Sequence, residues 1–160
     1  RAETRDADHK GRRRKMKGEE LMIGDWIVGP DLSPKRVVAI LNFDEIQVEE
    51  EPDSDTWITY SIGDVEPIPL LGWMLTYSGF RKYGENERQF WPFENWLYIN
   101  HRCNTRVAMW QSMDRWFFKH ESADGYTGIR TPLPTGSVHE LQHMLRLCGI
   151  DLDVNVLKLQ

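Results

Sequence analysis

The feature that most restricts the fold is a series of short β-forming segments in the first part of the chain. The sequence contains four of them, at 21–29, 36–41, 45–51 and 56–62, separated by residues that favour turns. In the last segment, TWITYSI, the side chains alternate between two faces, as in a strand with one buried side. Short strands at even spacing are typical of a small barrel or a curled sheet. Together with the opening GDWI, this pattern favours an SH3-like barrel.

The second part of the chain mixes helical and β patterns. Apolar residues at helical spacing predict a helix over 70–78, and Gly79 supplies its end. Aromatic-rich segments between 90 and 121 indicate an antiparallel meander. A second helix is expected from residue 138, and the alternation in LDVNVLKL predicts a closing strand over 152–159.

We therefore expect an α+β protein, in which a small SH3-like β-barrel segment precedes an antiparallel β meander with two helices. The expected parts are a disordered basic leader at 1–18, the SH3-like segment at 19–66, and an α+β unit at 67–160. The third part is expected to pack against the second, as a separate unit or within one compact domain.

Charge is distributed unevenly along the chain. Residues 1–17 contain eight Lys or Arg and three acidic residues, a net charge of +5, and the whole chain carries −5, which leaves −10 for the remainder. Nine acidic residues and no Lys or Arg lie between 44 and 66. Such a run is typical of a solvated face. It would repel nucleic acid and attract a basic protein.

No segment is long and apolar enough to span a bilayer, and no secretory signal is visible. The two cysteines, Cys103 and Cys148, are isolated, which fits a reducing compartment better than a disulfide scaffold. We expect a cytoplasmic protein without a membrane partner.

The stretch HELQH, at 139–143, matches the zinc-protease pattern His-Glu-x-x-His. On a helix, His139 and His143 lie one turn apart and can bind one zinc ion, while Glu140 acts on the metal-bound water. Catalytic zinc needs a third protein ligand, yet the segment after His143 contains no His and no Glu. The upstream candidates for that ligand are His101, Cys103 and His120.

A capped amphipathic helix explains the same residues without a metal, and we favour it. Ser137 and Glu140 have the spacing of a capping box, in which each side chain satisfies a free amide at the helix start. The predicted buried stripe consists of Val138, Leu141, Leu145 and Cys148, widened by Met144 and Leu147. The residues predicted at the solvent edge are His139, His143 and Arg146. This interpretation assigns no catalytic residue, metal ligand or cofactor, and zinc bound by HELQH is the alternative.

Basic residues are interleaved with the aromatic residues between 90 and 121. Core packing is the favoured role of the aromatic rings, with base stacking as the alternative. The candidate ligand-binding residues are Arg102, Arg106, Arg115 and Trp110. Two loops of the predicted barrel, 29–35 and 51–56, are a second candidate contact region.

Three segments resemble a family of small proteins from gut Bacteroidales and their phages. They are ELMIGDWI at 20–27, DVEPIPLLGWMLTYSGF at 64–80 and VHELQHMLRLCGI at 138–150, and the likeness covers most of 19–157. The family shows a GDWV-type opening, an IEPIPL segment and a late VHxLQ helix. In this chain Leu71-Gly72 replaces the polar start usual for the middle helix. The resemblance implies a bacterial or phage accessory protein and assigns no activity.

Taken together, the sequence favours a non-enzymatic binding module. An unknown protein is the expected partner, and a nucleic-acid-binding protein is the first alternative. The second alternative is a zinc-dependent hydrolase that uses His139, Glu140 and His143.

Overall fold

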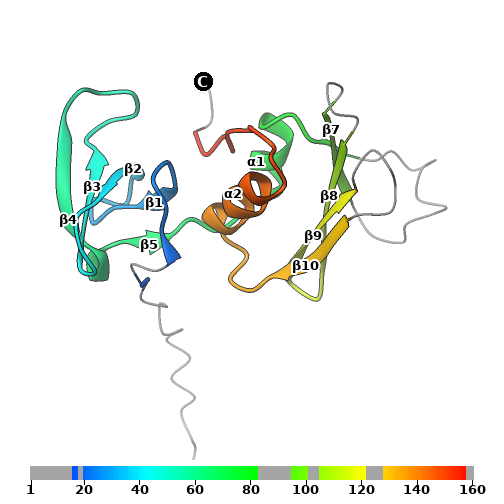
Figure 1. The fold of residues 1–160 in the computed structure, drawn as a ribbon, viewed down its shortest axis with the longest axis horizontal. Coiled ribbons are helices and arrows are strands. Elements are labelled where there is room, and N and C mark those ends of the chain that lie inside the picture. The colour runs from blue at the N-terminus through cyan, green and yellow to red at the C-terminus, as the bar shows by residue number, and fades with distance from the viewer. Residues whose placement is uncertain (1–15, 18–19, 83–94, 101–104, 122–127, 158–160) are drawn as a thin grey trace, which may run out of the picture.

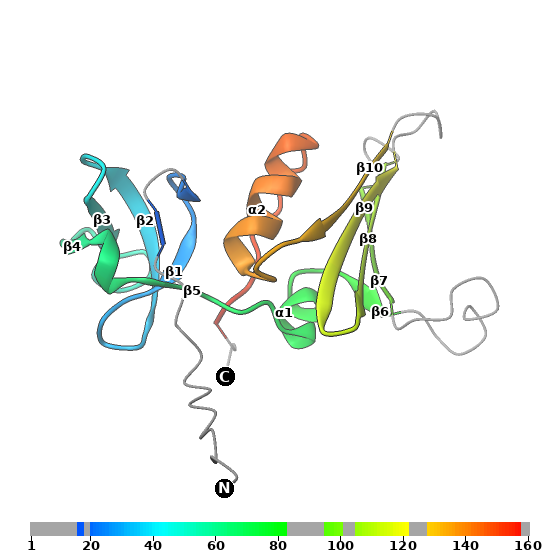
Figure 2. The ribbon, with the colours of Figure 1, turned by 90° about the horizontal axis from the view of Figure 1, so that it is seen from below.

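The computed structural model describes residues 16–17, 20–82, 95–100, 105–121 and 128–157. Two antiparallel sheets of five strands lie on either side of a helix (Figures 1 and 2). The protein is therefore α+β, as predicted, and most of its regular structure is strand.

The first sheet follows the predicted strand segments closely. Its strands are β1 (Trp26–Val28), β2 (Pro34–Ile40), β3 (Glu45–Glu49), β4 (Trp57–Ser61) and β5 (Glu66–Pro67). A short 3₁₀ helix, η2 (Ile62–Asp64), links the last two. The spatial order is β4-β3-β2-β1-β5, so the sheet has two edges. The predicted SH3-like barrel is not confirmed, because these strands curl without closing.

The second sheet is an antiparallel meander, as predicted. Its strands are β6 (Arg81–Lys82), β7 (Asn95–Asn100), β8 (Thr105–Ser112), β9 (Arg115–Glu121) and β10 (Gly128–Leu133). The spatial order β10-β9-β8-β7-β6 places each strand beside its neighbour in sequence. In β8 and β9, Val107, Met109, Trp116 and Phe118 face the interior. The alternate residues of both strands therefore face outward.

Two helices complete the fold. Helix α1 (Gly72–Tyr77) is shorter than the predicted helix over 70–78. Its first residue, Gly72, leaves room for the Trp96 ring, because a Cβ at this position would lie only 2.7 Å from the indole Cζ2. Helix α2 (Val138–Leu147) lies between the two sheets (Figure 1). No helix in the described part of the chain is long and apolar enough to cross a membrane.

The buried apolar residues form two clusters. The larger cluster lies between the second sheet and the helices, and it includes Trp26, Leu75, Trp116, Phe118, Leu141 and Leu145. The smaller cluster lies within the curl of the first sheet, and it includes Leu21, Ile27, Val37, Ile46, Val48 and Val65. Strand β1 contributes to both, because Trp26 and Ile27 point to opposite sides of the strand.

Two predictions about the C-terminal part are wrong. Residues 152–157 contain no strand, although Val154 and Val156 are buried in the larger cluster. The alternating apolar residues are therefore buried, as the pattern predicts, but the backbone that carries them does not pair with a strand. Leu147, placed in the buried stripe of the helix, is 69% exposed, because the stripe ends at Leu145 on that side.

Candidate functional site

Glu140, near the start of α2, binds the turn before the helix and does not form the predicted capping box. The carboxylate oxygen Oε1 accepts hydrogen bonds from the Thr135 amide at 2.9 Å and from the Ser137 hydroxyl at 3.1 Å. Ser137, the N-cap residue, makes no side-chain bond to the helix backbone. The reciprocal half of the capping box is therefore absent, and Glu140 instead stabilises the turn that precedes the helix.

His143 is held by an acidic residue of the first sheet. Its Nε2 lies 2.6 Å from Oδ2 of Asp25, and Arg146 donates from Nη1 to Oδ1 of the same carboxylate at 3.0 Å. The Met22 amide also donates to Oδ2, at 2.7 Å. Asp25 is fully buried, whereas His143 and Arg146 are 26% and 35% exposed. A buried carboxylate is tolerated because all three of its partners donate to it.

The residue next to His143 completes this contact with the first sheet. Gln142 is buried, and it accepts a hydrogen bond from the Trp26 amide at 3.0 Å and donates one to the Gly24 carbonyl at 3.1 Å. Gly24 has a φ of +91°, a conformation that favours glycine and that turns the chain toward the helix. We call Asp25, Gln142, His143 and Arg146 the Asp25 clamp. No local pattern predicts the clamp, because its two halves lie more than a hundred residues apart in the chain.

The prediction that His139 lies at the solvent edge is wrong. Its side chain is 4% exposed, and its ring packs edge-on against that of His143, with the centroids 5.6 Å apart. The helix is buried on more than one side because it lies between two sheets. The prediction assumed an amphipathic helix with one solvent-exposed face, and it therefore placed His139 at the solvent edge.

This geometry does not favour zinc bound by HELQH. The Nε2 atom of His143 is already engaged by the Asp25 carboxylate, and Oε1 of Glu140 is engaged by the turn before the helix. Among the described residues, no three His, Cys, Asp or Glu side chains are grouped closely enough to hold a metal ion. Two of the predicted third ligands, His101 and Cys103, lie outside the described residues, and His120 belongs to no such group.

A cavity of about 400 Å³ lies beside these residues, between α2 and β10. Its lining includes His139, Glu140 and His143, together with Glu20. The apolar part of the lining comes from Pro132, Leu133, Pro134 and Met144. This volume lies within the range of about 300–1,000 Å³ that is usual for small-molecule sites. We call it the α2 cavity.

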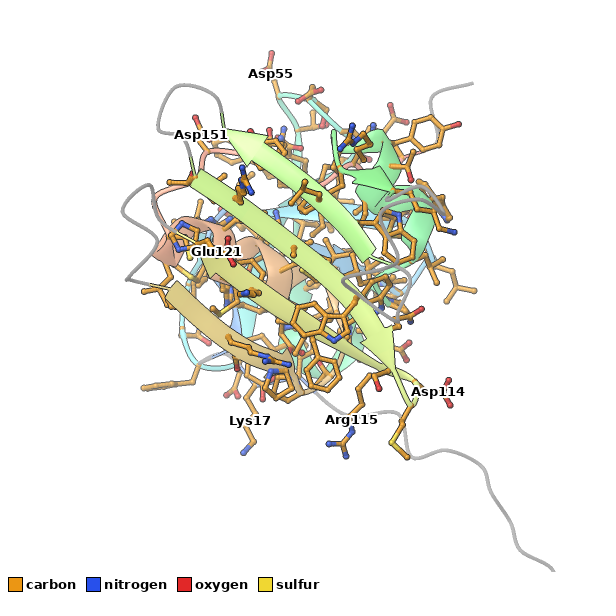
Figure 3. The ribbon with its side chains drawn as sticks, turned by 90° about the vertical axis from the view of Figure 1, so that its right-hand side faces the viewer. Lys17, Asp55, Asp114, Arg115, Glu121 and Asp151 are labelled. Carbon is orange, nitrogen blue, oxygen red and sulfur yellow. The ribbon has the colours of Figure 1, made fainter. Side chains whose placement is uncertain are left out.

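The second candidate site is the outer face of the second sheet, which Figure 3 views directly. Three predicted ligand-binding residues lie there, since Arg106, Trp110 and Arg115 all occupy outward positions in β8 and β9. The fourth, Arg102, lies outside the described residues. The strand register adds Lys119, one of the basic residues interleaved with the aromatic ones, and two cations that the sequence pattern did not indicate, Arg81 and Arg130. We call Arg81, Arg106, Arg115, Lys119 and Arg130 the basic face.

Few of the described residues on this face are acidic. Glu121 is the outward carboxylate of the described strands, and it pairs with Lys119 at 2.7 Å. Asp114 lies in the turn at the end of the sheet, beside Arg115 (Figure 3). Within the described part of the chain, Arg106 forms no ion pair. The face therefore carries an excess of positive charge on a protein whose net charge is −5.

Aromatic rings form part of the same face. The rings of Trp110 and Phe117 stack, with centroids 5.5 Å apart and planes at 10°, and the Arg130 guanidinium lies 5.4 Å from the centre of the Trp110 ring. Trp110 is only 7% exposed, whereas Arg130 is exposed. The face thus offers a ligand the guanidinium plane of Arg130, supported by an aromatic ring.

The two predicted contact loops of the first sheet are held by internal interactions. The Lys35 ammonium contacts the Glu50 carbonyl and lies 3.3 Å from the Asp31 carboxylate. Hydrogen bonds from Ser33 hold the pKa of Asp31 below its usual value.

Arg36, on β2, orders the second loop, because its guanidinium binds the carboxylates of Glu49, on β3, and of Asp53, in the loop at 51–56. The hydrogen bond that Arg36 donates to the Glu49 carboxylate is the main cause of a raised pKa for Arg36. These polar groups serve to order the loops, and neither loop presents a cluster comparable to the basic face.

Comparisons with known proteins identify no relative. No protein-family model, curated protein or solved structure matches the chain. The resemblance to a family from gut Bacteroidales and their phages stays a prediction, since none of these comparisons bears on it. Function must therefore be argued from the α2 cavity and the basic face.

Proposed function

We propose that this protein is a binding module for single-stranded nucleic acid, and that the basic face is its contact surface. The observation that carries this proposal is the gathering of five cations on one side of an antiparallel sheet in an otherwise acidic protein.

The charge distribution supports a polyanionic ligand. Cations that only keep a protein soluble are expected to be interspersed with acidic residues. On the basic face the described acidic groups are Glu121, which pairs with Lys119, and Asp114 at the end of the sheet. A concentrated positive field of this kind attracts phosphate groups and speeds their association. The acidic run at 44–66 belongs to the other sheet, so it would repel a strand from that side and favour binding on this one.

The shape of the surface supports a single strand rather than a duplex. The groove of B-DNA accommodates a helix or a two-stranded ribbon, whereas this face is a sheet of several strands. Single strands instead lie across sheets, where their bases stack on aromatic rings or on guanidinium planes. Arg130, supported by Trp110, provides such a plane, and an incoming base would extend the stack.

An enzyme is the weaker candidate on the same geometry. A zinc-dependent hydrolase would require His143 to leave a fully buried carboxylate that it contacts at 2.6 Å. An unknown protein partner, which the sequence favours, remains the alternative to nucleic acid.

The test is fluorescence anisotropy with a labelled single-stranded oligonucleotide of about 20 nucleotides, longer than the roughly 4–16 nucleotides bound by one OB-fold. The key variant replaces Arg106, Arg115 and Arg130 by Glu. We expect its affinity to fall at least tenfold at low salt. The logarithmic salt dependence, measured between about 50 and 200 mM, should become shallower by about 2, because each phosphate contact to a single strand contributes about 0.7.

Two further variants control for charge outside the basic face. Lys17→Glu changes the charge at an exposed position of the N-terminal segment, and it should alter binding little. Replacing Arg12, Arg13 and Arg14 by Ala tests the basic leader. The proposal is overturned if the oligonucleotide does not bind at low salt, or if the leader variant abolishes binding while the triple Glu variant does not.

A further inference from the structure

We propose that the α2 cavity is a binding site for a small organic cation, specifically an amine carried on an apolar body. This inference is independent of nucleic-acid binding, because none of the five residues that define the basic face lines the cavity.

The size and lining of the cavity define the apolar part of the ligand. A volume of about 400 Å³ accommodates a ring with a short chain. Leu133 and Met144 provide apolar surface from β10 and α2, and Pro132 and Pro134 provide more. Burial of an apolar ligand against these side chains would supply most of the favourable free energy.

Several hydrogen-bond donors of the lining are already used within the protein, and this favours a ligand that brings its own donors. The Thr131 hydroxyl donates to the Pro132 carbonyl, and the Thr135 hydroxyl donates to Ser137. The Thr135 amide donates to Glu140. The two prolines of the lining have no amide proton. A ligand that needs hydrogen-bond donors from the protein would therefore find few of them here.

His143 lines the cavity with a ring whose hydrogen-bonding role follows from its contact with Asp25. The other partners of Asp25 are donors, so the carboxylate is an acceptor and Nε2 of His143 carries the proton of their shared hydrogen bond. In the neutral ring the remaining nitrogen, Nδ1, is then an acceptor. The Asp25 clamp thus fixes the tautomer of a ring that lines the cavity.

Two carboxylates give the lining its negative charge. Glu20 and Glu140 both line the cavity, and its described lining residues include no Lys or Arg. An ammonium group is a compact donor of three hydrogen bonds without any acceptor, so it matches acceptors and carboxylates. An anionic ligand of the same shape would meet like charge.

The test is isothermal titration calorimetry of the full chain with phenethylamine, and with 2-phenylethanol and 3-phenylpropionate as neutral and anionic probes of similar shape. We expect phenethylamine to bind at least tenfold more tightly than the alcohol, and the carboxylate to bind more weakly than either. Glu20→Gln, which removes one charge at almost constant volume, should weaken phenethylamine binding at least threefold and leave the alcohol unaffected.

A second variant tests the location. Thr131→Phe fills the cavity from β10 with a residue suited to a strand, and it should weaken phenethylamine at least tenfold without changing oligonucleotide binding. If this variant does not fold, amide chemical shifts of the unmodified protein decide, since phenethylamine should shift α2 and β10 selectively. Equal affinities for the three probes, or shifts confined to other elements, would overturn the proposal.

Discussion

Helix α2 contacts its two neighbouring sheets through different chemistry. On its apolar side it presents Leu141 and Leu145, which are almost completely buried in the larger apolar cluster, with Trp116 and Phe118 of the second sheet and Trp26 of the first. Toward the first sheet it presents Gln142, His143 and Arg146, which bind Asp25 and its backbone neighbours. Apolar contact is non-directional and scales with area, whereas hydrogen bonds require defined positions. The apolar cluster therefore supplies most of the packing energy of the helix, and the hydrogen bonds to the first sheet fix its orientation.

The largest expected effect is on the apolar side. Leu141→Ala should lower the free energy of unfolding by about 2–5 kcal/mol, because it removes buried apolar atoms and leaves a cavity that the surroundings fill only in part. The measurement is urea denaturation followed by tryptophan fluorescence. Leu147→Ala on the same helix, at a residue 69% exposed, should change stability by less than about 0.5 kcal/mol. A loss below 1 kcal/mol for Leu141→Ala would contradict this account of the apolar side.

A smaller effect is expected on the polar side. Gln142→Met keeps the volume of the side chain but removes both hydrogen bonds, so the Trp26 amide and the Gly24 carbonyl lose their partners. The expected cost is about 1–3 kcal/mol. Hydrogen exchange at the Trp26 amide should also become faster. Gln111→Met, at an exposed glutamine of β8, is the matched control and should be close to neutral. A cost larger than that of Leu141→Ala would reverse the comparison.

The smallest effect concerns the thiol at the end of α2. Burial raises the pKa of Cys148, so a smaller fraction is thiolate at a given pH. In a Cys103→Ser background, alkylation at pH 8 should be slower than for free cysteine by about two- to tenfold. Cys148 packs against the larger cluster, so Leu141→Ala should speed the reaction and Gln142→Met should not. Equal acceleration by both variants would show that the two sides of the helix are not separable.

The strands of the first sheet could be predicted because their signals are local. Turn residues and alternation placed β2, β3 and β4 within a few residues of their observed bounds. Closure of a barrel depends on how the edge strands meet, and β4 and β5 do not pair. No local pattern specifies that contact.

The candidate sites were less predictable because they depend on contacts between distant segments. The burial of His139 and the engagement of His143 follow from the position of α2 between two sheets, which its own sequence does not reveal. The basic face was visible in part, since Arg106 and Arg115 lie in strands with clear alternation. Arg81 and Arg130 join that face only through the pairing of β6 with β7 and of β10 with β9.

The Asp25 clamp has a consequence for the order in which the protein can mature on the ribosome. Asp25 is synthesised early, while its partners His143 and Arg146 follow 118 and 121 residues later. Until those residues emerge, the carboxylate lacks its two side-chain donors and gains more from water than from the interior. The strands of the first sheet can pair during translation, but the edge around Gly24 should stay solvated until the last helix arrives. Completion of the N-terminal half thus waits for the C-terminal one. A nascent chain that stops before α2 would leave the Asp25 carboxylate without its two side-chain donors and exposed to water.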